Sequence, residues 1–94
     1  MARASAILAI RYAHPLEQVG GALETALGEG GWKIDLIERE DGEIRAGKRG
    51  WFGYRTIDIS LEAQGNETEA TYTRRCKTDE FDALVRAVEI QLSV

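Results

Sequence analysis

Residues suited to molecular recognition are concentrated at positions 45–55 of this sequence, which read RAGKRGWFGYR. The stretch holds four cationic and three aromatic side chains and no acidic one. Tryptophan, tyrosine and arginine often anchor protein interfaces, and aromatic rings beside cations also stack on the bases of single-stranded nucleic acids. A second basic cluster, RRCK at positions 74–77, follows later in the chain. These two segments are the main candidates for a binding surface.

Residues that could support catalysis are few. His14 is the only histidine and Cys76 the only cysteine, so a metal site or a nucleophile–base pair would need them to meet each other or a serine. We expect them at opposite ends of a sheet, because the strand before His14 and the strand before Cys76 should run in opposite directions. The neighbouring Arg74, Arg75 and Lys77 predict a lowered pKa for the Cys76 thiol. The sequence therefore predicts a protein that is not an enzyme, with no catalytic residues, metal site or cofactor.

The elements that position these residues follow from hydrophobic periodicity. Alternation of apolar and polar residues predicts strands over 5–12, 32–37, 44–46, 56–61 and 68–75. Helical spacing predicts amphipathic helices over roughly 15–28 and from 78 or 79 to 92. In the second strand we expect Trp32, Ile34 and Leu36 to face inward. The Asp41-Gly42 pair predicts a hairpin turn after that strand.

The element order β-α-β-β-β-β-α predicts an α+β two-layer sandwich within a single domain, 1–94. Short connections make the second to fifth strands a meander. The simplest closure places the first strand beside the fifth, in the order 1-5-4-3-2, all antiparallel, with both helices on one face. The other face should be polar and mixed in charge, as solvated sheet faces are.

Hairpin geometry brings the two basic segments together. A turn over positions 64–67 sets Arg55 roughly opposite Arg75, so 74–77 should lie at the same end of the sheet as the 48–55 hairpin. Seven of the twelve cations fall in these two segments, and the rest of the chain sums to −11, since −4 minus 7 is −11. The protein should therefore be electrically polarised, with one basic, aromatic end.

Several motifs carry a resemblance. AL at 22–23, GWKI at 31–34, GEIRA at 42–46 and IDI at 57–59 resemble small uncharacterised bacterial domains that often occur in lipoproteins, and the element order is similar to that of TATA-binding-protein-like domains. The resemblance covers roughly residues 20–62 and implies a fold, but it implies no catalytic residues. The export signal and lipid-attachment cysteine of those relatives have no counterpart here. DNA binding is not implied, because the polar face lacks the apolar wedges and basic balance of minor-groove binders.

Three interpretations of the basic-aromatic end remain open. In one, Trp51 or Phe52 covers the core and the cations neutralise Glu29, Asp79 and Glu80. In another, the end binds a protein partner, a second copy of the chain included. In the third, it binds an anionic polymer or surface, either single-stranded nucleic acid or anionic lipid. We expect non-catalytic binding of a protein partner. The surface should comprise Lys48, Arg49, Trp51, Phe52, Tyr54, Arg55, Arg74, Arg75 and Lys77.

The composition of the chain indicates its cellular location and argues against some classes of binding partner. A single cysteine forms no internal disulfide, and the apolar stretch 6–10 is too short to span a membrane, so we expect a cytoplasmic protein without a transmembrane segment. The net charge of −4 argues against a general nucleic-acid binder. No small-molecule substrate is inferred.

Overall fold

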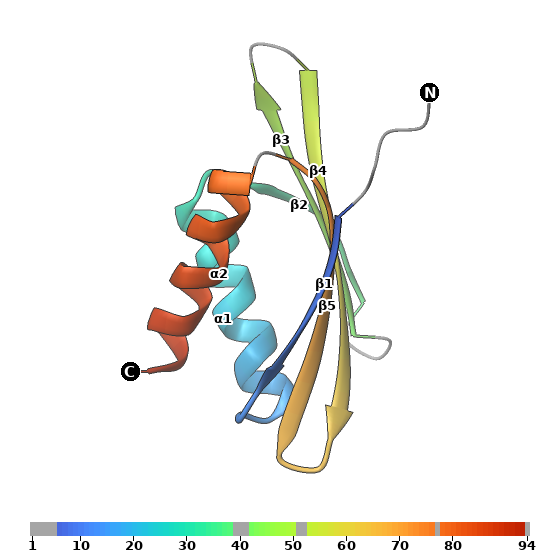
Figure 1. The fold of residues 1–94 in the computed structure, drawn as a ribbon, viewed down its shortest axis with the longest axis vertical. Helices are drawn as coiled ribbons and strands as arrows, with labels where there is room; N and C mark the ends of the chain where they lie inside the picture. The colour runs from blue at the N-terminus through green and yellow to red at the C-terminus, as the bar shows by residue number, and fades with distance from the viewer. Residues whose placement is uncertain (1–5, 39–41, 51–52, 77, 94) are drawn as a thin grey trace.

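Within the described part of the chain, five strands and two helices form in the order that the periodicity predicts. The computed structural model describes residues 6–38, 42–50, 53–76 and 78–93. Along the chain the elements are β1 (Ala6–Tyr12), α1 (Leu16–Glu29), β2 (Lys33–Glu38), β3 (Glu43–Gly50), β4 (Gly53–Gln64), β5 (Glu67–Arg75) and α2 (Thr78–Leu92). The strands form one antiparallel sheet in the order β1-β5-β4-β3-β2, and both helices cover the same face of it (Figure 1). The predicted α+β sandwich and strand order are confirmed.

The helices form where apolar residues recur every three or four positions. Helix α1 follows Pro15, whose φ of −68° suits a helix start, and it ends where the Gly30 N–H donates to the Ala26 carbonyl. Helix α2 has Asp79 and Glu80 in its first turn, where the helix dipole favours acidic side chains. The helix residues buried against the sheet are Val19, Ala22, Leu23, Ala26 and Leu27 in α1, and Phe81, Leu84 and Val88 in α2.

The core lies between the sheet and the two helices. Tyr72 is its largest fully buried side chain, and its ring meets that of Phe81 edge to face at 5.3 Å. The hydroxyls of Tyr72 and Tyr12 are 2.6 Å apart, so two buried polar atoms satisfy each other. Thr68, also buried, donates its hydroxyl to the His14 carbonyl at 2.9 Å.

The β3–β4 hairpin extends past the rest of the sheet. The pairing of β3 with β2 ends at Gly47, which is opposite Lys33. The pairing of β4 with β5 ends at Thr56, which is opposite Arg75. Among the strands that the structure describes, residues 48–50 and 53–55 therefore pair only with each other, and we call them the projecting hairpin (Figure 1). Arg75 pairs with Thr56, one position from Arg55, the partner that the sequence predicted. The two basic segments share one end of the sheet, as expected.

A β-bulge in β2 changes the face that its second half presents. Ile34 pairs with Ala46, and Leu36 pairs with the preceding residue of β3, Arg45. Asp35, between Ile34 and Leu36, is therefore the extra residue of the bulge. Beyond the bulge, Leu36 lies on the outer face with Arg45, and Ile37 lies on the inner face with Ile44. The prediction that Leu36 faces inward with Trp32 and Ile34 is therefore wrong.

Gly42 begins the return of the chain into β3. Its φ is +68°, and a Cβ there would collide with the Leu61 carbonyl oxygen. The close approach lets the Leu61 N–H donate to the Gly42 carbonyl at 2.7 Å. Glycine is therefore required at position 42. The rest of the predicted Asp41-Gly42 turn lies outside the described residues.

Candidate functional site

Strand alternation divides the basic-aromatic end between the two faces of the sheet. Lys48, Arg55 and Arg74 lie two positions along their strands from Ala46, Ile57 and Tyr72, which are all buried in the core. We call these three the inner cations. The next residue beyond each inner cation lies on the opposite face, and we call these three, Arg49, Tyr54 and Arg75, the outer basic surface. Trp51, Phe52 and Lys77, also predicted for the site, lie outside the described residues.

Two of the inner cations converge on Glu80 in the first turn of α2. The Arg55 Nε is 3.3 Å from one Glu80 carboxylate oxygen, and the Lys48 Nζ is 4.0 Å from the other. The Lys48 ammonium also donates to the Gly30 carbonyl at 2.8 Å and lies 5.6 Å from the centre of the Trp32 ring. The Glu80 side chain is only 18% exposed. These contacts connect β3, β4 and α2 across the open end of the core.

Arg74, the third inner cation, packs on the core itself. Its guanidinium lies 5.3 Å from the centre of the Phe81 ring and donates to the Cys76 carbonyl at 3.0 Å. The interpretation in which cations neutralise nearby acids therefore describes Lys48 and Arg55, whereas Arg74 acts through a ring and a carbonyl.

The outer basic surface is exposed and partly ordered by a tyrosine. The Tyr54 side chain is 56% exposed, and its hydroxyl donates to the Asp35 carboxylate at 2.8 Å. The hydrogen bond to this carboxylate raises the pKa of Tyr54. The ring crosses β3 at Gly47, where a Cβ would collide with it. Glycine at 47 and the bulge at Asp35 together allow the tyrosine to lie along the sheet. Arg49 and Arg75 are exposed beside it.

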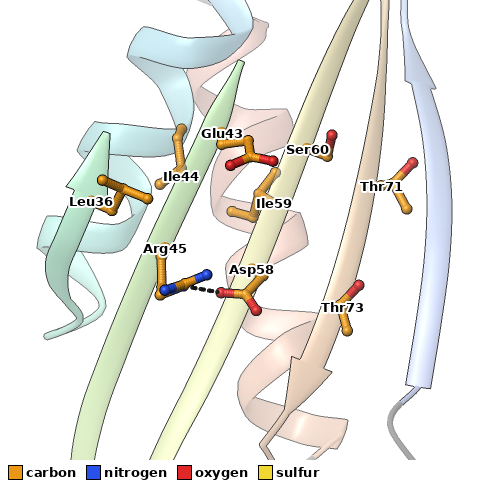
Figure 2. Close-up of a pocket in the computed structure, with 9 residues that line it drawn as sticks. All are labelled: Leu36, Glu43, Ile44, Arg45, Asp58, Ile59, Ser60, Thr71 and Thr73. Carbon is orange, nitrogen blue, oxygen red and sulfur yellow. Dashed lines mark hydrogen bonds and ion pairs between the residues drawn. The ribbon is translucent and has the colours of Figure 1, made fainter. Parts of the chain in front are cut away.

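A shallow groove of about 230 Å³ continues along the outer face (Figure 2). Arg45 and Asp58 form an ion pair across it at 3.0 Å, with both side chains more than half exposed. Besides this pair, its lining residues are Leu36, Glu43, Ile44, Ile59, Ser60, Thr71 and Thr73. The hydroxyls and charges confirm the predicted polar, mixed-charge face. They offer hydrogen bonds to a ligand, but no hydroxyl in this group is paired with a histidine base.

The Cys76 thiol has a raised pKa, and the predicted lowering is wrong. Burial of the side chain contributes most, the Glu80 carboxylate adds to it, and Arg74 and Arg55 oppose the shift without reversing it. The prediction counted the neighbouring cations but neither the burial of the side chain nor the Glu80 carboxylate, which together outweigh Arg74 and Arg55.

His14 lies far from Cys76, as predicted. It follows the end of β1 at which Tyr12 pairs with Thr68, whereas Cys76 follows the opposite end of β5. Its Nδ1 is 3.1 Å from the Gln18 side-chain oxygen, at the start of α1. Among the described residues, no group of three or more histidine, cysteine or acidic side chains could hold a metal ion.

The residues that the sequence interpretation missed are acidic or small. Glu80 was named only as one of several nearby acids, and Asp35 and Gly47 were not connected with Tyr54. Counting two positions back from Ile57 and two positions forward from Tyr72 would have assigned Arg55 and Arg74 to the inner face. The bulge that brings Asp35 toward Tyr54 has no comparable pattern in the sequence.

Comparisons with known proteins indicate the fold alone. No protein-family model and no curated protein matches the chain. Among solved structures, the crystal structure of Ara h 8.0201, a Bet v 1-like fold, is similar with a TM-score of 0.52 and 9% identity, over 97% of this chain and 100% of that one. At this identity the similarity assigns no family. The resemblance to TATA-binding-protein-like and bacterial lipoprotein domains is not confirmed. In the described part of the chain, no helix is long and apolar enough to cross a membrane.

Proposed function

We propose that this chain is a non-catalytic binding domain that engages an acidic protein partner through the outer basic surface on and beside the projecting hairpin. The observation that carries the proposal is the division of the basic end between two faces. The inner cations have partners within the molecule, while Arg49, Tyr54 and Arg75 are displayed together on the outside. Such a domain suits the cytoplasm, where its single cysteine stays reduced.

Charge and geometry both support a protein partner of negative charge. Among the described residues, neither Arg49 nor Arg75 takes part in an ion pair, so their charges remain available. Arg49 is directly opposite Tyr54, and Arg75 is opposite Thr56, two positions along the same strand. Side chains at such diagonal positions are about 7–8 Å apart, which suits one patch of contact. Tyr54, held by Asp35, presents its ring with little conformational freedom left to lose on binding.

The projecting hairpin also fits contact with a folded partner. Among the described residues, its two strands pair with no other strand, so a partner can reach it from the outer face without meeting the helices (Figure 1). Trp51 and Phe52 connect its two strands in the sequence and would add apolar contact area, as tryptophan does in interface anchors.

The test is partner capture with charge-reversed variants. Tagged wild-type chain and the Arg49→Glu/Arg75→Glu double variant are used to capture proteins, which are identified by mass spectrometry and then purified for direct titration. Arg86→Glu is the matched control, because Arg86 is exposed on α2, on the other side of the sheet. We expect a specific acidic protein that binds the wild type and the control, with affinity at least tenfold lower for the double variant.

Titration of a single-stranded oligonucleotide and of anionic-lipid vesicles distinguishes the alternative ligands. Binding to either that falls steeply with salt and is lost in the double variant would replace the protein partner with an anionic polymer or surface. Equal capture by all three chains would reject the outer basic surface as a site.

A further inference from the structure

The two edges of the sheet differ in their protection against pairing with another strand. At the β2 edge, the strand carries the charges Lys33, Asp35 and Glu38 and is interrupted by the bulge, features that discourage edge pairing. At the β1 edge, residues 6–10 read AILAI, and the strand pairs with β5 without interruption. Ile7 is 68% exposed and Leu8 is 45% exposed. Only β1 therefore has an apolar, regular edge.

We infer that β1 pairs with β1 of a second copy of this chain, antiparallel, to form a symmetric dimer with one continuous ten-stranded sheet. This inference concerns a surface separate from the outer basic surface and is independent of the function proposed above. Among the described residues, no strand covers the outer edge of β1. An isologous dimer is the commonest form of soluble oligomer, and an antiparallel strand edge can satisfy a copy of itself.

The sequence of β1 selects the register and favours a copy of itself as the partner. Ala9 is the middle of the seven residues, so a two-fold axis through Ala9 pairs the whole strand with its copy. Leu8 is then opposite Ile10 of the second copy, which places apolar side chains together on the helix-covered face.

On the outer face of the same register, Ile7 is opposite Arg11 of the second copy. The two Arg11 charges are kept apart, because each has Ile7 rather than Arg11 as its partner. Arg11 is already balanced within its own copy, since Glu67 and Glu69 lie 3.9 and 3.7 Å from its guanidinium. Its aliphatic stem can therefore cover Ile7 of the second copy without an uncompensated charge.

The test is sedimentation velocity of the whole chain from about 5 to about 500 µM, with two variants that replace the same apolar group by opposite charges. Ala9→Lys and Ala9→Glu each place two like charges directly opposite each other at the two-fold axis, at a position exposed in the single chain. We expect each variant alone to raise the dimer dissociation constant about tenfold or more, and an equimolar mixture of the two variants to restore association, because opposite charges then face each other. Ile90→Lys, at a 57% exposed position on α2, should leave the constant unchanged.

Hydrogen exchange gives a second measure of the same pairing. Amides in β1 that face the free edge should become more protected as the concentration rises, while those of β2 should not change. A wild type that stays monomeric across the range would overturn the inference, as would a mixture of Ala9→Lys and Ala9→Glu that associates no better than either variant alone. The Arg49→Glu/Arg75→Glu variant should dimerise normally, so failure here and failure of the proposed binding site are distinguishable.

Discussion

At the scale of single residues, the paired hydroxyls of Tyr12 and Tyr72 are the most consequential buried polar groups. Burial raises the pKa of both phenols above the ordinary value of 10.0, most strongly for Tyr72, and nearby Glu89 adds to the shift. The hydrogen bond between them lowers the pKa of Tyr12 and raises that of Tyr72. The folded protein therefore holds both phenols protonated at a pH where the unfolded chain ionises them.

This pair predicts a loss of stability in alkaline solution. Below pH 10 both the folded and the unfolded state keep their phenol protons, so ionisation of these tyrosines does not yet reduce the free energy of unfolding. Above pH 10 the unfolded state loses protons first, and the free energy of unfolding should fall by up to about 1.4 kcal/mol per pH unit for each tyrosine, until the folded state ionises. Urea denaturation at a series of pH values from about 8 to 11 measures it.

The control for this prediction is the Tyr12→Phe/Tyr72→Phe double variant. It removes both hydroxyls together, so that no single hydroxyl remains buried without its hydrogen-bond partner. Its free energy of unfolding should depend less steeply on pH above 10, with lysine ionisation common to both proteins. Parallel curves for the variant and the wild type would show that the buried phenols do not cause the alkaline loss.

At the scale of the element, the bulge in β2 decides which side chains of that strand contribute to the core. Leu36 lies on the outer face and is only partly buried, whereas Ile57 in β4 is fully buried. We expect Leu36→Ala to lower the free energy of unfolding by less than about 1 kcal/mol, and Ile57→Ala by about 2–5 kcal/mol. Urea denaturation of both variants compares them directly. A loss for Leu36→Ala as large as that for Ile57→Ala would place Leu36 in the core and contradict the bulge.

The same strand shows why some of the fold could be predicted and some could not. Five strands, two helices and their order follow from local periodicity and short connections, which act within each segment. Leu36 was assigned inward because an alternating pattern assumes one constant register. The extra residue, Asp35, depends on a non-local contact with Tyr54 that passes over Gly47. Only the assembled strands β2, β3 and β4 contain that information.

At the scale of the whole molecule, the two basic segments lie at one end of the sheet, but their charged side chains lie on two different faces. Register placed the two basic segments at one end of the sheet, and that much could be predicted from the turn at 64–67. The sequence could not show which of these cations remain available, because Glu80 reaches Lys48 and Arg55 only after α2 has packed across the sheet. The raised pKa of the Cys76 thiol could not be predicted either, because the sequence shows its cationic neighbours but neither its burial nor the approach of Glu80.

Glu80 should therefore contribute to holding the two layers together at this end. Glu80→Gln keeps the shape of the side chain but removes the charge facing Lys48 and Arg55, whose side chains are 31% and 25% exposed. We expect the free energy of unfolding to fall by about 2 kcal/mol, because partly buried cations lose their counter-charge. Asp58→Asn is the control, since it removes an exposed pair with Arg45 and should cost about 0–1 kcal/mol. Urea denaturation at low salt and at about 0.5 M salt separates the two, because exposed pairs are screened and partly buried ones much less. Equal losses for both variants, abolished together by salt, would mean that Glu80 is an ordinary surface acid and that the end of the core is closed by packing alone.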